Sequence, residues 1–292
     1  MTEATDEYLR HRDLVLRLAY DITASWADAE DIAQQVFLRW NRWNPVGEVR
    51  NPRAYLARIA TNQALDVVAA RDRVGYPGPY LPEPIATGPG AEEAVAIADE
   101  VEIALMVVLG SLSPLERAVF VLHDVFAFTH AEIGTMLERS SDAVRQLASR
   151  ARRHVHSRGA APEPVDHGEL AEFTARFLAA ARDGDVPGLR EYLTEDVVFV
   201  GDGGGKRAAG RRPIVGADKV ARFFAGIARE VGEHTRIVAV EANHRPALAI
   251  YQGDELDQVL WLVLQEGRLA QALAVRNPDK LTRIAGQFTS SP

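Results

Sequence analysis

The chain of 292 residues contains no cysteine. This absence excludes disulfides, thiolate nucleophiles and cysteine-ligated zinc, and it leaves only histidine and carboxylate side chains for any metal. We expect neither a metal site nor a cofactor. No apolar run approaches membrane-spanning length, and the first residues, MTEATDEYLRHRD, lack the basic start and apolar stretch of a signal peptide. We therefore expect a soluble protein that works in the cytoplasm and has no membrane partner.

Positive charge is also scarce: the chain has 33 Lys and Arg but 41 Asp and Glu, which gives a formal net charge of −8. This balance argues against general coating of nucleic acid, but it leaves a local basic face possible. The hydrophobic fraction of 47% is ordinary for a globular protein. A chain of this length and composition should bury a sizeable core in two or three globular units.

A glycine-rich stretch, VFVGDGGGKRA, raises the question of phosphate binding. A Walker loop needs glycine five residues before the Gly-Lys pair and Ser or Thr after it, but these places hold Val200 and Arg207. A dinucleotide fingerprint starting at Gly201 fails as well, because Lys206 stands at its third glycine position. Nucleotide binding is therefore not expected, and the three glycines instead favour a turn that another chain segment touches.

The first 73 residues have a helical pattern of apolar residues. Ser25 is the predicted N-cap of one helix, and Asn51 followed by Pro52 is the predicted start of another. Residues 74–91 are rich in proline and glycine, which predicts an extended linker.

Helical patterning resumes over residues 92–158. Two capping boxes predict where helices begin: Ser113 with Glu116, and Thr129 with Glu132. The second helix is short and ends near Leu137, and the turn ERSS joins it to the helix DAVRQLASRARRHVH. A short capped helix, a tight turn and a second helix are typical of a helix-turn-helix.

The last of these helices has one narrow apolar stripe, formed by Val144, Leu147, Ala148, Ala151 and Val155. Its opposite side is polar and rich in arginine, which suits contacts with base edges and phosphates. The alternative is a solvated surface helix. The residues predicted to bind an upstream DNA element are Ser140, Ser141, Asp142, Arg145, Gln146, Ser149, Arg150 and Arg153.

The rest of the chain predicts an α+β fold. A short linker, 159–167, precedes predicted helices over 169–182 and 217–231. Alternating or apolar runs predict five strands: DVVFV, HTRIVAVEA, ALAIYQ, DQVLWLVLQ and RLAQALAV.

The helix-turn-helix stretch, LSPLERAVFVLHDVFAFTHAEIGTMLERSSDAVRQLASRARRHV, resembles the DNA-binding region 4 of extracytoplasmic-function sigma factors of the sigma-70 family. The stretches DITASWADAEDIAQQVFLRWNRW and NPRAYLARIATNQALD are similar to region 2 of the same family, which binds core RNA polymerase and opens the promoter. Both occur in the family's order, joined by a linker. The resemblance implies two all-α domains, region 2 over 1–73 and region 4 over 92–158.

The resemblance also implies roles for residues of region 2. The side chains expected to contact core polymerase are Asp28, Glu30, Asp31, Gln34 and Gln35. Those expected to bind the melted downstream promoter element are Arg53, Tyr55, Arg58, Asn62 and Gln63, since amides can hydrogen-bond an extruded base and arginines can follow the backbone. The alternative is that these are ordinary solvated helix residues.

The tail, residues 168–292, contains the stretch FLAAARDGDVPGLREYLTEDVVFVGDGGGKRAAGRRPIVGADKVARFF. This stretch looks like the SnoaL-like fold, a cone-shaped α+β domain whose relatives include cyclases and isomerases. The candidates for a general base are His234, His244, Asp202 and Tyr251, but their spacing identifies no base with its orienting partner, so no catalytic residue is predicted.

A subgroup of these sigma factors carries such a domain fused, with three short signatures that stand here as YLPEP, DGGGK and NPDKL. Tyrosine replaces the tryptophan of the first, which keeps a stacking surface but changes the hydrogen-bonding group. We expect these segments to meet, with Lys206 and Lys280 pairing with Glu83 or Asp279; the alternative is a turn that needs its glycines only for geometry. The residues of this expected regulatory contact are Tyr80, Leu81, Pro82, Glu83, Pro84, Asp202, Gly203, Gly204, Gly205, Lys206, Asn277, Pro278, Asp279, Lys280 and Leu281.

The function expected from the whole chain is that of an alternative sigma factor whose tail modulates it in cis. The expected partners are core RNA polymerase and promoter DNA, with a small-molecule effector as a further candidate and no separate anti-sigma factor. The alternative function is a DNA-tethered domain that binds or converts a small molecule.

Overall fold

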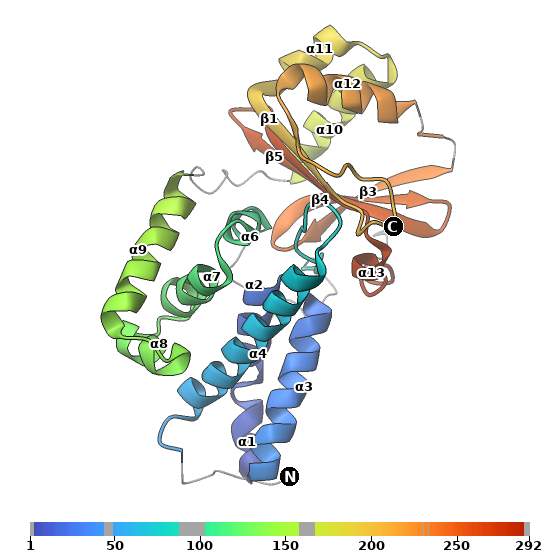
Figure 1. Ribbon diagram of the computed structural model, residues 1–292. Coiled ribbons are helices and arrows are strands. Elements are labelled where there is room, and N and C mark those ends of the chain that lie inside the picture. Colours follow the sequence, from blue (N-terminus) through green and yellow to red (C-terminus); the bar gives the residue numbers. More distant parts are fainter. Residues whose placement is uncertain are drawn as a thin grey trace. The chain divides into compact units, whose positions relative to one another are not determined.

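The computed structural model describes residues 3–43, 49–87, 103–157, 167–229, 231–232 and 234–288. They form two compact units, one combining the chain up to residue 75 with 103–157 and the other combining 76–87 with 167–288 (Figure 1). Residues 76–87 of the predicted linker therefore belong to the same unit as the tail. The predicted boundaries at 92 and 158, and the linker residues 88–91 and 159–166, lie outside the described residues.

The first unit is helical, as predicted. Its described elements are α1 (Glu3–Leu9), α2 (Arg12–Thr23), α3 (Trp26–Trp43), α4 (Pro52–Val74), α6 (Ile103–Gly110), α7 (Pro114–Phe120), the π-helix η1 (Val121–Val125), α8 (His130–Leu137) and α9 (Ser141–Ser157). The predicted caps are confirmed: Ser25 Oγ accepts a hydrogen bond from the Asp28 amide, and Asn51 Oδ1 accepts one from the Ala54 amide. Both predicted capping boxes are present. The π-helix was not predicted.

Apolar faces hold the helices of the first unit together. Ile22, Ile32 and Leu56, from α2, α3 and α4, are buried, and the buried Trp40 indole donates a hydrogen bond to a backbone carbonyl of α1. The stripe predicted on α9 is buried from Val144 to Ala151. The buried Arg117 guanidinium on α7 donates to the carbonyl of Ile22 at 2.8 Å, so the helices before and after the linker pack into one unit.

The second unit has an α+β fold, as predicted. Its described elements are α10 (His167–Arg182), α11 (Val186–Glu191), β1 (Leu193–Asp202), β2 (Ile214–Val215), α12 (Ala217–Ala228), β3 (Thr235–Ala242), β4 (Arg245–Gln252), β5 (Glu255–Gln265), β6 (Arg268–Val275) and α13 (Pro278–Leu281). The five predicted strands are confirmed, whereas α11, β2 and α13 were not predicted.

The strands form one six-stranded sheet in the order β2-β1-β6-β5-β4-β3, in which β1 and β6 are parallel and the other neighbours antiparallel. Asp202 at the end of β1 lies opposite Val275 at the end of β6. Since parallel strands end at the same edge, the segments that follow them, DGGGK and NPDKL, meet there.

Helices α10, α11 and α12 cover one face of this sheet (Figure 1). Aromatic side chains fill the space between them and the strands: the rings of Phe177 and Phe224 lie 4.9 Å apart, and those of Phe199 and Phe223 lie 4.3 Å apart. This cluster forms the apolar core of the unit. Among the described helices of both units, none is long and apolar enough to cross a membrane.

Candidate functional site

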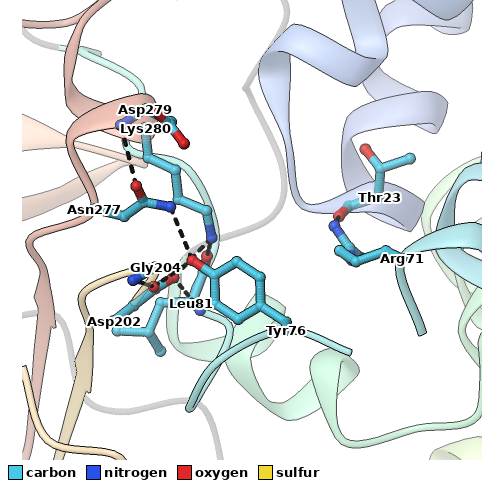
Figure 2. Close-up of polar contacts among 9 residues, drawn as sticks. All are labelled: Thr23, Arg71, Tyr76, Leu81, Asp202, Gly204, Asn277, Asp279 and Lys280. Carbon is cyan, nitrogen blue, oxygen red and sulfur yellow. Dashed lines mark hydrogen bonds and ion pairs between the residues drawn. The ribbon is translucent and has the colours of Figure 1, made fainter. Parts of the chain in front are cut away.

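The end of β1 carries a fully buried carboxylate, Asp202, whose relative exposure is 0%. One carboxylate oxygen accepts hydrogen bonds from the Tyr76 hydroxyl and the Gly204 amide, and the other accepts from the Leu81 amide at 3.0 Å and from Lys280 Nζ at 2.8 Å (Figure 2). A buried charge is stable only when it is paired and hydrogen-bonded. We call this cluster of Tyr76, Tyr80, Leu81, Asp202, Asn277 and Lys280 the linker dock.

Lys280, on the short helix α13, is the counter-charge of the linker dock and is only 6% exposed. Its ammonium also donates to the Leu81 carbonyl and lies 3.2 Å from the centre of the Tyr80 ring, a cation–π contact. Asn277 begins the helix as N-cap and donates to the Tyr76 hydroxyl at 2.9 Å. Burial, followed by the hydrogen bond to Asp202, raises the pKa of Tyr76 far above its usual value.

Two glycines of DGGGK are required by geometry. Gly204 has φ of +60°, and a Cβ there would lie 2.4 Å from the Asn277 side chain. Gly205 has φ of +73°, and its Cβ would lie 2.8 Å from the Pro77 ring. Because only glycine combines positive φ with such close approach, the turn fits against Asn277 at Gly204 and against the linker at Gly205 without a side chain between them.

The linker makes a second contact farther along, at the turn between β3 and β4. Asn243 makes two hydrogen bonds with Ile85. The side-chain oxygen of Asn243 accepts from the Ile85 backbone amide, and the backbone amide of Asn243 donates to the Ile85 carbonyl at 2.8 Å. Ala86 bridges Ala242 as an antiparallel pair, and the Thr87 amide donates to a carbonyl of β3. Residues 81–87 are all buried, so this stretch of linker lies against the tail and is bridged to the end of β3 at Ala86.

The structure thus brings the three predicted segments together. The predicted Lys206–Asp279 ion pair is confirmed at 2.7 Å. Lys280 pairs with Asp202, a partner that the sequence expectation did not include. Sequence reasoning also missed Tyr76 and Asn243, although an Asn-His pair between two strand patterns is itself a hairpin-turn signal.

The residues expected to contact polymerase lie on one polar side of α3. Glu30, Asp31, Gln34 and Gln35 are exposed and Asp28 is half-buried, whereas the apolar side of the helix is packed in the core. A shallow depression of about 520 Å³ lies beside them and is lined by Gln35, Leu38, Arg39, Arg42 and Gln63. Gln35 of the polymerase set and Gln63 of the DNA set therefore share one surface.

The residues expected to bind the downstream element divide into two groups. Asn62 is exposed on α4, and Tyr55 packs against the Trp40 ring with 6.0 Å between centroids. Arg53 and Arg58 are instead held by region 4. The Arg53 guanidinium donates to the Phe126 carbonyl at 2.7 Å, and Arg58 pairs with Glu138 at 3.2 Å.

The predicted DNA-binding side chains of α9 are exposed, except for Ser141, which is half-buried. Ser140 precedes the helix, is exposed, and its hydroxyl accepts a hydrogen bond from the Ala143 amide. Arg145 pairs with Asp142 at 2.6 Å, and Arg150 pairs with Glu116 at 2.8 Å. The hydrogen bond from the Ser113 hydroxyl, followed by that from Arg150, holds the pKa of the Glu116 carboxyl below its usual value. Asp142 and Glu116 thus orient the guanidiniums of Arg145 and Arg150 on the exposed side of the helix.

The four candidates for a general base occupy structural positions. Asp202 is used by the linker dock, His244 lies in the β3–β4 turn, and Tyr251 lies beneath the Arg236 guanidinium at 4.1 Å. His234 is exposed in the turn just before β3. No group of three or more metal-binding side chains occurs in the described part of the chain.

Comparison with known proteins places these features in a family. Residues 8–74 match the family model for sigma-70 region 2, and residues 102–155 match that for sigma-70 region 4. The chain is 34% identical to the ECF RNA polymerase sigma factor SigJ of Mycobacterium tuberculosis, over 94% of this chain and 92% of that protein. It is 29% identical to the probable ECF RNA polymerase sigma factor SigI of the same species, over 95% and 94%.

The crystal structure of Mycobacterium tuberculosis SigJ is similar along nearly the whole length. It matches with a TM-score of 0.73 at 32% sequence identity, covering 95% of this chain and 98% of that chain. The similarity therefore includes the tail as well as the two helical regions.

Proposed function

The chain belongs to the extracytoplasmic-function sigma factors of the sigma-70 family, and from this premise we propose that it joins core RNA polymerase in the cytoplasm and directs promoter-specific transcription initiation. The observation that carries the proposal is that α3 and α9 each bury an apolar stripe and leave a polar side exposed. The polar side of α3 presents carboxylates and amides to the polymerase, and the polar side of α9 presents arginines to DNA.

The side chains of α9 divide by the chemistry they can perform. Arg145 and Gln146 stand early in the helix, where the recognition helix of a helix-turn-helix meets base edges. Arg150 and Arg153 stand a turn or more later and suit phosphate oxygens. Base contacts then give promoter preference, and phosphate contacts give affinity that falls with salt.

We further propose that the tail controls this activity in cis through the linker dock. Residues 76–87 follow region 2 directly along the chain and belong to the same unit as the tail, and 81–87 are buried there. A fused domain has a high effective concentration at its own linker, so modest contacts suffice to shift a two-state equilibrium. A separate anti-sigma factor is then not required.

Promoter-dependent transcription with purified core enzyme tests the sigma function. Run-off products from genomic fragments enriched by the holoenzyme are expected, and no product on any fragment contradicts the proposal. Asp31→Lys should weaken capture of core enzyme by reversing charge on the exposed side of α3. Glu172→Lys, which makes the same charge change on the exposed surface of α10, is the matched control and should leave capture unchanged.

We propose no enzymatic activity, since the similar proteins are sigma factors and the four candidate bases serve turns, strands or the linker dock. A small-molecule effector stays a prediction. Thermal-shift screening tests it, because a ligand that binds the folded state raises the unfolding temperature by an amount that grows with the logarithm of its concentration over Kd.

A further inference from the structure

We propose that an arginine-rich loop of the tail, residues 206–212, contacts the phosphate backbone of double-stranded promoter DNA. This goes beyond control through the linker dock, because it gives the tail a nucleic-acid contact of its own. The inference rests on the proposed sigma function, since that function brings the chain to promoter duplex.

The loop concentrates positive charge in a chain that has little of it. Its sequence, KRAAGRR, has four basic residues in seven and no acid, whereas the whole chain has a formal net charge of −8. Every residue of the loop except Ala209 is exposed. A basic segment at the surface of an acidic protein attracts a polyanion locally.

Contacts on its backbone hold the loop in one shape. Arg276 donates to the Ala208 carbonyl at 2.7 Å, and its guanidinium also pairs with Asp257 at 2.8 Å. A Cβ at Gly201 would lie 1.8 Å from the Ala209 carbonyl oxygen, so the loop lies directly on the end of β1. A loop that is already ordered loses little conformational entropy when it binds.

Ion pairing leaves two of the four charges without a partner. Lys206 and Arg207, at the start of the loop, are each paired with an exposed acid, at 2.7 and 2.8 Å. In the part of the chain that the structure describes, neither Arg211 nor Arg212 forms an ion pair. A guanidinium offers parallel N–H donors to a phosphate, and these two give up no ion pair when they bind one.

The side chains of the loop favour duplex DNA over single strands. Proteins that hold single-stranded nucleic acid stack bases on aromatic rings, and the loop has no aromatic residue. Contacts with the phosphates of a duplex need only charge and hydrogen-bond donors.

The loop also rests on the linker. A Cβ at Gly78 would lie 3.7 Å from the Cα of Arg211, and a Cβ at Gly205 would lie 2.8 Å from the Pro77 ring. Because the linker residues come directly after α4, which ends at Val74, the docked linker ties the loop to the chain segment that follows region 2. DNA that binds the loop in this state stabilises the docked linker.

The test measures binding of full-length protein to a short fluorescein-labelled duplex that carries one promoter from the run-off assay. Arg211→Gln with Arg212→Gln should weaken binding about 5- to 50-fold and reduce the salt slope by about 1.8, because each phosphate contact contributes about 0.9. Arg229→Gln with Arg268→Gln removes the same charge from two exposed sites elsewhere on the tail. This control should stay within about twofold of wild type, because salt screens distant charges.

The contact can be located directly because the chain has no cysteine. Ala208→Cys, at an exposed position of the loop, takes an iron chelate that releases hydroxyl radicals. The radicals should cut the bound duplex at one place, and adding Arg211→Gln and Arg212→Gln should reduce the cutting. Bound duplex that stays uncut contradicts the inference.

Binding data overturn the inference in two further ways. The first is a loop variant that binds the duplex as tightly as the Arg229→Gln, Arg268→Gln control does. The second is an equal loss of affinity for polyglutamate, or a larger loss for single-stranded RNA, measured by competition. The partner would then be an acidic protein surface or RNA.

Two measurements separate this inference from the other proposals. If Arg153→Ala weakens binding and the loop variant does not, only the loop contact is wrong; if neither variant weakens binding, the assignment of α9 to DNA fails as well. Hydrogen exchange of the Leu81 amide should be the same in the loop variant and wild type. Faster exchange would assign the lost affinity to the linker dock and overturn the direct contact.

Discussion

Replacing Lys280 by methionine should release the linker from the tail. The substitution keeps a long apolar stem but removes the ammonium, which bonds Asp202 at 2.8 Å, the Leu81 carbonyl and the Tyr80 ring. Asp202 is left fully buried without its counter-charge. The carboxylate must then find water or a proton, and either outcome disrupts its bonds to the linker.

The size of this effect follows from burial. Breaking a buried ion pair by removing one partner costs about 3–5 kcal/mol, and the three donors that remain on Asp202 favour the lower end of that range. Lys206→Met is the matched control. It removes the same charge from a pair whose side chains are 55% and 63% exposed, where the expected cost is about 0–1 kcal/mol.

Hydrogen exchange of the linker amides measures the difference. The Leu81 amide donates to Asp202 and should exchange roughly 100-fold faster in Lys280→Met, since each 1.4 kcal/mol lost from local opening is about a factor of ten. In Lys206→Met the exchange rate of the Leu81 amide should stay within about fivefold of the wild-type rate. Equal protection of Leu81 in both variants would refute the argument that the buried pair holds the linker.

Three further predictions concern separate parts of the chain. Leu81→Ala, at a side chain only 2% exposed, should cost about 2–5 kcal/mol of linker docking and change promoter output more than Lys206→Ala, in transcription assays on proteins that both remain folded. Arg145→Ala should change base preference in a binding selection, whereas Arg153→Ala should weaken all sequences alike and reduce the salt slope. The pKa of Glu116 is below its usual value in the folded state, so its contribution to stability is present above pH 4.5 and lost as pH falls; Glu116→Gln should flatten that part of the unfolding profile.

Local structure was predictable because its causes lie within a few residues. The caps at Ser113 and Thr129 and the buried stripe of α9 depend on spacings of three and four, and the structure has them where the sequence predicts. The strands of the tail likewise follow from alternation and β-branched residues. The helix α11 was missed because its six residues, VPGLRE, contain proline and glycine and no apolar period.

The pairing inside the linker dock could not be derived from spacing. Asp202 and Lys280 are 78 residues apart, and they meet because β1 and β6 are parallel neighbours that end together. Which lysine is buried and which is exposed depends on that register. The hydrogen bond between Arg53 and region 4 was missed for the same reason. Arg53 donates to the backbone carbonyl of Phe126, 73 residues away, and every residue has such a carbonyl, so no side chain in the sequence identifies the acceptor.

The most direct test of the account is run-off transcription from one promoter by core enzyme saturated with wild type, Lys280→Met or Lys206→Met. Saturation separates control of initiation from affinity for core. The account predicts that Lys280→Met changes the yield severalfold while Lys206→Met matches wild type. If Lys280→Met frees the Leu81 amide in hydrogen exchange yet transcribes as wild type does, the tail does not control the sigma factor through its linker.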